Sequence, residues 1–165
     1  MSMFGEMLRI KRHRESRAEQ EVLRAGGELA SAVAAREQAE TTLRDYRDWA
    51  LRRERELYQA LCEKPVRLRD IEDVQFSVVE LRGGERSRQE ALDHAEKARV
   101  NAAEQLDRAR NGHRDAVRMK EKFVELVQNF DQERLAELQR LEDLEMEEVR
   151  AVRNDEDEQW EAPHE

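Results

Sequence analysis

Apolar residues recur alternately every four and every three positions from Ala18 to Ala60, and this spacing predicts one long amphipathic helix. Only Arg36 and Arg53 interrupt the apolar stripe. A heptad pattern sustained over many turns and flanked by Glu, Arg and Gln is typical of a coiled coil rather than of the surface helix of a globular domain. We therefore expect a first coiled-coil helix over residues 1–61.

A second apolar stripe with helical spacing predicts a second coiled-coil helix over residues 69–152, after a turn over residues 62–68. The turn is placed at Pro65, because proline has no backbone N–H and pushes Lys64 away from helical dihedral angles. Asp70 is a suitable cap for the beginning of the second helix.

Three further features interrupt the regular pattern. The pairs Gly26-Gly27 and Gly83-Gly84 lower helix propensity by about 1 kcal/mol per glycine, but we expect both helices to continue through them. Arg36 and Arg53 are expected to pack their aliphatic stems along the helix–helix seam and to direct their guanidinium groups toward neighbouring glutamates. Residues 153–165 are strongly acidic and are expected to form a disordered tail.

Alanine recurs at heptad spacing in both predicted helices and indicates how they pair. These alanines are Ala18, Ala25, Ala32 and Ala39 in the first helix and Ala95, Ala102, Ala109 and Ala116 in the second. Because large residues should face small ones, an antiparallel pairing about the turn places Leu29 opposite Ala102 and Ala25 opposite Leu106. A register shifted by one heptad, with Leu29 opposite Ala109, also alternates large and small residues. The predicted fold class is therefore all-α, with two long helices forming an antiparallel coiled-coil hairpin.

The first of these registers leaves the end of the second helix without a partner from the same chain, because Met1 lies opposite Phe130. An apolar stripe nevertheless continues there, through Leu135, Leu138, Leu141, Leu144, Val149 and Val152. An uncovered apolar stripe commonly marks a surface for another protein. The alternatives are a frayed helix end and a homodimer contact. The candidate partner-binding residues in this segment are Leu138, Leu141, Leu144 and Val149.

The composition narrows the function classes. Charged residues make up 42% of the chain and hydrophobic residues only 38%, so the chain cannot enclose the wide core of a compact multilayer enzyme. The net charge is −9, with a basic N-terminus and an acidic C-terminus, which argues against a nucleic-acid-binding protein. At the N-terminus Arg9, Arg14 and Arg17 form either a solvated face or a candidate surface for an acidic partner.

Three aromatic residues, Tyr46, Trp49 and Tyr58, lie close together on more than one face of the first helix. They cannot all be buried against one partner helix. Since aromatic side chains with a polar tip are favoured at protein interfaces, Trp49 and Tyr58 are candidate contact residues. The alternative is that they pack over Gly83-Gly84, which the register places nearby.

No constellation in the sequence carries catalytic or metal chemistry. The four histidines are scattered, and Cys62, the single cysteine, has no neighbouring His or Cys with which to form a zinc site or an activated nucleophile. The glycine pairs lack the Lys-Ser/Thr of a phosphate-binding loop. We expect a non-enzymatic protein without cofactors. The absence of an apolar leader and of a run of about 18 apolar residues predicts a cytoplasmic protein with no direct membrane insertion.

Three segments are more specific than heptads alone. They are Leu8-Arg-Ile10-Lys11-Arg-His-Arg14-Glu-x-Arg17-Ala18-Glu, the block Leu43-x-x-Tyr46-x-x-Trp49-(x)7-Leu57-Tyr58-x-x-Leu61-(x)4-Val66-x-Leu68-x-x-Ile71, and Lys122-Phe123 followed by Leu144-Glu-Met-Glu-Glu-Val149. Together they resemble the YscO family, the small stalk proteins of bacterial type III secretion systems that are related to flagellar FliJ. The similarity extends over nearly the whole chain.

This resemblance implies a helical hairpin similar to the central stalk of rotary ATPases. Family members bind the hexameric secretion ATPase, promote its assembly and turnover, and link it to the cytoplasmic domain of the export gate protein. They are also reported to engage chaperones of exported substrates. The resemblance thus implies association with the inner-membrane secretion apparatus through partners. The competing hypotheses are a coiled-coil scaffold and an export chaperone or chaperone escort that does not act on the ATPase. A self-sufficient hairpin is expected to be monomeric.

Overall fold

The computed structural model describes residues 3–160, and within that range it consists of two helices, α1 (Met3–Cys62) and α2 (Leu68–Trp160), with no strand. The predicted all-α fold of two long helices packed against each other is confirmed. Both glycine pairs lie inside these helices, as expected, and none of the described glycines has a positive φ angle.

The expected end of the second helix at Val152 and the expected disordered tail differ from the structure. Helix α2 continues through residues 153–160 to Trp160, so the tail prediction is wrong for that segment. No glycine or proline occurs between Val152 and Trp160, and the next helix-breaking residue in the sequence is Pro163. Residues 161–165, also part of the expected tail, lie outside the described residues.

The beginning of α2 is fixed by a local cap. The carboxylate of Asp70 accepts a hydrogen bond from the backbone N–H of Arg67 at 3.1 Å, and the backbone N–H of Asp70 donates to the carbonyl of Arg67 at 3.0 Å. Asp70 therefore acts as the third helical residue that reaches back to the cap, the second half of a capping box, rather than as the cap itself. Asp70 thus takes part in capping α2, but from the third helical position and not from the cap position that the sequence suggested.

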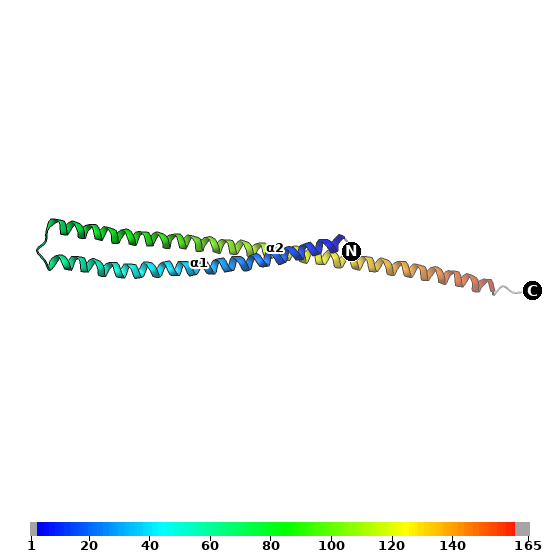
Figure 1. Cartoon of the computed structure of the whole chain (residues 1–165). Coiled ribbons are helices and arrows are strands. Elements are labelled where there is room, and N and C mark those ends of the chain that lie inside the picture. Colours follow the sequence, from blue (N-terminus) through cyan, green and yellow to red (C-terminus); the bar gives the residue numbers. More distant parts are fainter. Residues whose placement is uncertain (1–2, 161–165) are drawn as a thin grey trace, which may run out of the picture. The chain divides into compact units, whose positions relative to one another are not determined.

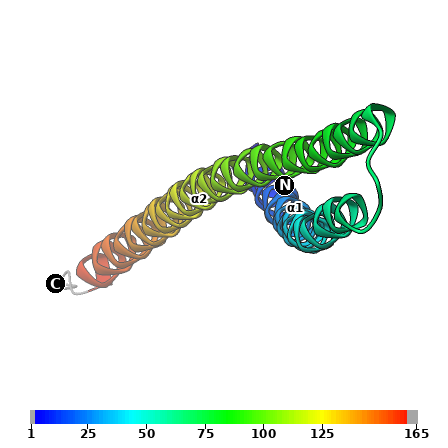
Figure 2. The same cartoon turned by 90° about the vertical axis from the view of Figure 1, so that its left-hand side faces the viewer.

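The chain divides into two compact units. Unit 2 is Arg17–Arg114, and unit 1 combines the N-terminal residues up to Ser16 with the chain from Asp115 onward. In unit 2, α1 and α2 run antiparallel on either side of the turn (Figure 1). Figure 2 looks at unit 2 from the turn, where residues 63–67 join the two helices.

The core of unit 2 is a thin seam between the two helices. Its buried hydrophobic residues are Ala25, Leu43, Ala50, Val74, Val78 and Leu106. No polar or charged residue in the described part of the chain is fully buried. A pair of helices can bury only one narrow stripe on each, so the heptad positions supply nearly all of the buried apolar surface.

The contacts nearest the middle of unit 2 favour the first predicted register. Ala25 and Leu106, which that register pairs, are both buried. The same register places Ala95 opposite Arg36, which forms an ion pair with the neighbouring Glu96, whereas the register shifted by one heptad would place Ala102 there. Closer to the turn, the contacts of the long side chains Arg47 with Gln89 and Arg82 with Glu54 fall between the two registers.

In unit 1 the first residues of α1 pack on α2 through mixed contacts. The rings of Phe4 and Phe130 lie 5.3 Å apart, and Nζ of Lys11 lies 5.1 Å from the centre of the Phe123 ring. The predicted neighbour of Phe130 was Met1, which lies outside the described residues. The neighbour of Phe130 in the structure is Phe4. This offset has a physical reason, because helical side chains lean toward the N-terminus of their own helix and contacts between antiparallel helices are therefore shifted along the axis.

Candidate partner-binding surfaces

The described residues contain no group of three His, Cys, Asp or Glu side chains arranged to hold a metal ion. Cys62 is a free, exposed cysteine at the end of α1. Among the described helices, none combines the length and apolarity needed to cross a lipid bilayer.

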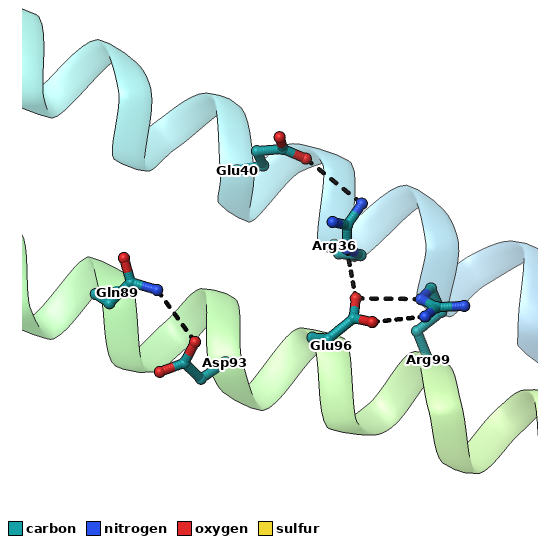
Figure 3. A network of polar contacts seen from close by, with 6 residues as sticks. All are labelled: Arg36, Glu40, Gln89, Asp93, Glu96 and Arg99. Carbon is teal, nitrogen blue, oxygen red and sulfur yellow. Dashed lines mark hydrogen bonds and ion pairs between the residues drawn. The ribbon is translucent and has the colours of Figure 1, made fainter.

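A polar network crosses the seam of unit 2 at Arg36 (Figure 3). Arg36 forms ion pairs with Glu96 on α2 and, at 3.5 Å, with Glu40 one turn along α1. Glu96 also accepts hydrogen bonds from Nε and Nη2 of Arg99, at 3.1 and 2.5 Å. The arrangement confirms that the guanidinium group of Arg36 is directed toward neighbouring glutamates, and the same holds for Arg53, which pairs with Glu56 within α1.

The charge of Glu96 is stabilised by this network. The hydrogen bonds from Arg99 are the main cause, assisted by the nearby charges of Arg99 and Arg36, and together they hold the pKa of the Glu96 carboxyl below its ordinary value. The same contact raises the pKa of Arg99. Since these side chains remain partly exposed, the network contributes little to overall stability.

Tyr46 fills the space above Gly84 in unit 2. Its hydroxyl donates a hydrogen bond to the carbonyl of Leu81 at 2.8 Å, and the guanidinium carbon of Arg88 lies 3.9 Å from the centre of its ring. Arg88 in turn donates to the carbonyl of Gly84 at 3.0 Å. A Cβ atom at Gly84 would lie 2.7 Å from Cζ of Tyr46, so glycine is required at this position while the ring stays in place.

The alternative role considered for Trp49 and Tyr58, packing over Gly83-Gly84, is therefore wrong, because Tyr46 takes the space above Gly84. Trp49 packs against Tyr46 with ring centres 5.6 Å apart. Trp49 and Tyr58 are both 47% exposed. Their role as contact residues remains a prediction.

Trp49 lines an open groove of about 900 Å³ in unit 2, and Tyr58 does not. The groove is lined by Thr42, Asp45, Tyr46, Trp49, Arg53, Leu57, Ser77, Glu80, Leu81 and Arg88. Sequence reasoning did not single out Arg88, or the exposed apolar residues Leu68, Phe76 and Val79 at the beginning of α2. The helical spacing of these three apolar residues could have indicated a second apolar stripe on α2, one that lies outside the seam with α1.

The three N-terminal arginines are exposed. Arg9 and Arg14 belong to unit 1, whereas Arg17 is the first residue of unit 2. Between them, Glu15 turns toward α2 and pairs with Lys120 at 2.7 Å. The arginines lie on other faces of α1, where a partner could reach them.

The last part of α2 forms a third candidate surface. We call residues 131–158 the overhang, because every side chain in this segment of unit 1 is exposed. The predicted contact residues Leu138, Leu141, Leu144 and Val149 are 50%, 48%, 49% and 57% exposed. The overhang carries twelve acidic and four basic residues, a net charge of −8. The predicted uncovered apolar stripe is thus present, on a strongly acidic helix.

Comparison with known proteins gives two matches. A family model described as type III secretion protein YscO matches residues 4–152. A 2.8 Å crystal structure of the type III secretion protein YscO from Vibrio parahaemolyticus is similar to this structure, with a TM-score of 0.84 and 27% sequence identity. The similarity covers 88% of this chain and 92% of that chain. No curated protein matches the sequence.

Proposed function

The chain belongs to the YscO family of type III secretion proteins, and from this membership we propose that it is the non-enzymatic central stalk of a type III secretion ATPase. In this role it binds the ATPase hexamer, promotes its assembly and turnover, and couples it to the cytoplasmic domain of the export gate protein. Chaperones of exported substrates are further proposed partners. The protein then works on the cytoplasmic side of the inner membrane, held there by its partners.

The observation that carries this proposal is the family match over nearly the whole chain. One feature of the structure supports it. Unit 1 exposes oppositely charged segments, the basic beginning of α1 and the acidic overhang, which suit the binding of charged partners.

Coupling by such a stalk follows from symmetry. A pair of helices has no six-fold symmetry, so it can bind only one or two subunits of a six-membered ring strongly at a time. The stalk favours the subunit conformation to which it binds more tightly. If that conformation also binds nucleotide with a different affinity, stalk binding changes the nucleotide affinity of that subunit, because coupling between two sites is reciprocal. We assign the ring contact to the charged faces near the chain termini, including Arg9, Arg14 and Arg17. Another part of the hairpin, for which Trp49 and Tyr58 are candidates, meets a second partner.

The first test is ATP turnover by the type III secretion ATPase of the same organism, with and without this protein, over a range of ATPase concentrations. Stimulation should be greatest at low ATPase concentration, where the hexamer is poorly assembled. If turnover never changes and no complex forms, the stalk role is wrong and a scaffold or export chaperone becomes the leading account.

A charge-reversed variant locates the contact. Arg9→Glu, Arg14→Glu and Arg17→Glu together should weaken stimulation, because they invert the exposed charge of the N-terminal face. The matched control replaces three exposed arginines near the turn with Glu, which changes the net charge equally. These are Arg52, Arg55 and Arg69. Equal stimulation by the N-terminal variant and the control would remove the N-terminal face from the proposal.

A further inference from the structure

One face of the overhang combines apolar and acidic side chains. Between Leu138 and Val152 this face has six residues, all exposed: Leu138, Leu141, Glu142, Glu145, Val149 and Val152. At about 100° per residue they fall within an arc of roughly 100° on α2, and we call them the acidic–apolar face. Leu144 lies beyond the edge of this arc, so it is a less central contact than its predicted role implied.

The charges on this face have one sign. An ordinary amphipathic helix places its charged residues on the side opposite the apolar stripe. Here Glu145 lies among the apolar residues and Glu142 borders them, whereas Arg140 and Arg150, the two arginines between Leu138 and Val152, project from the other side of the helix. Arg134 lies on the same arc, but one turn before Leu138 and so outside the face. No ion pair in the described part of the chain involves either glutamate.

A second copy of the chain does not suit this face. Two overhangs paired through it would bring together two segments of net charge −8 and would place Glu142 and Glu145 in the shared seam. Like charges opposed across a seam are destabilising. Anionic lipid surfaces and nucleic acids are disfavoured for the same electrostatic reason.

We propose that the acidic–apolar face docks a basic amphipathic helix of a partner protein. The apolar side chains of the partner pack on Leu138, Leu141, Val149 and Val152, and its Lys or Arg side chains pair with Glu142 and Glu145. The face spans about 21 Å along α2, which accommodates roughly four turns of a partner helix. This inference goes beyond the proposed function, since it concerns the chemistry of whichever protein binds the overhang and applies to a scaffold as well as to a stalk.

The test uses the full-length chain and a labelled synthetic helical peptide with Leu at the seam positions of each heptad and Lys at the flanking positions. A peptide of the same pattern with Glu in place of Lys is the reference. Binding is followed by fluorescence anisotropy at about 0.15 M salt, where charges more than about 8 Å apart are largely screened. The unaltered protein should bind the basic peptide and not the acidic one.

Two variants with equal changes in net charge separate a docking face from general attraction. Glu142→Lys with Glu145→Lys should weaken binding of the basic peptide by at least about tenfold and create binding of the acidic peptide. Asp143→Lys with Glu147→Lys alters the opposite side of the helix and should leave the affinity within about threefold of the unaltered protein. Circular dichroism of each variant verifies that helix content is unchanged.

An apolar pair of variants tests the other half of the proposal. Leu138→Gln with Val149→Gln should weaken binding about tenfold or more, since both side chains lie on the face. Ala136→Gln with Ala151→Gln, outside the face, should have little effect. Equal losses in a variant and its control would overturn the proposal, as would a concentration-dependent dimer in light scattering. A failure of ATPase stimulation alone would contradict the proposed function and leave this inference standing.

Discussion

Adjacent glycines of α2 provide a sharp test of the packing in unit 2. A Cβ atom at Gly84 would lie 2.7 Å from Cζ of Tyr46, whereas one at Gly83 would meet no atom within 4 Å. Replacing a glycine inside a helix with alanine stabilises the helix by roughly 0.5–1 kcal/mol at either position. The comparison of Gly83→Ala with Gly84→Ala cancels this shared gain and isolates the contact with the ring.

The magnitude follows from what the Tyr46 side chain loses when it is displaced. Its hydroxyl gives up the hydrogen bond to the carbonyl of Leu81, which is worth about 0.5–1.5 kcal/mol. Its ring gives up the contact with the guanidinium group of Arg88, worth about 0.5–1 kcal/mol at an exposed site. The Gly84→Ala chain should therefore be about 1–2.5 kcal/mol less stable than the Gly83→Ala chain.

The assay is urea unfolding followed by far-ultraviolet circular dichroism, with the midpoints of the two variants compared. The same two substitutions are then made in a Tyr46→Ala chain, where no ring occupies the space above Gly84. In that background both alanines should raise the midpoint equally. If Gly84→Ala raises the midpoint as much as Gly83→Ala while Tyr46 is present, the ring does not occupy this position in solution and the reasoning is refuted.

Three other predictions follow from single residues. Hydrogen bonds from Arg99 lower the folded-state pKa of Glu96, so the charged carboxylate stabilises the fold at pH values above its ordinary pKa. This stabilisation is lost as the pH falls through the lowered pKa. The urea midpoints at pH 7 and pH 3 should therefore differ less in the Glu96→Gln variant than in the unaltered protein. Leu43→Ala should cost about 2–5 kcal/mol in thermal or urea unfolding, because this side chain is only 3% exposed, whereas Leu51→Ala, at 54% exposed, should cost little. Asp70→Ala should cost about 0.5–1 kcal/mol through loss of the capping contact, and an unchanged midpoint would show that the cap does not hold α2.

The helix pair and its register could be predicted because they depend on periodic features. The heptads define one stripe on each helix, and alanine opposite leucine selects the alignment that buries Ala25 with Leu106. Pro65 fixes the turn because its backbone geometry does not depend on the rest of the fold. The exposed overhang then follows from the unequal lengths of the two helices.

The contacts that could not be predicted depend on particular side-chain conformations. The heptad spacing places Tyr46, and not Trp49, in the apolar stripe of α1, so the pattern could have pointed to Tyr46 as the ring nearest Gly84. It does not predict the conformation of that ring, which is held by the hydrogen bond to Leu81 and the stacking of Arg88, both from the other helix. The end of α2 differs from the prediction for another reason: acidic composition alone does not imply disorder, and no helix-breaking residue follows Val152 until Pro163.

Charged residues near the seam show what the overhang lacks. Where α1 and α2 pack together, each helix supplies the opposite charge for the other: Arg36 pairs with Glu96 in unit 2, and Glu15 pairs with Lys120 in unit 1. In the overhang, Glu142 and Glu145 occupy a similar apolar stripe, but no second helix of this chain covers them. A partner that completes this face must do what α1 does elsewhere. It must cover the apolar residues and bring cationic side chains to the glutamates. Burying the glutamate carboxylates without a cationic partner would cost more free energy than burial of the apolar side chains gains.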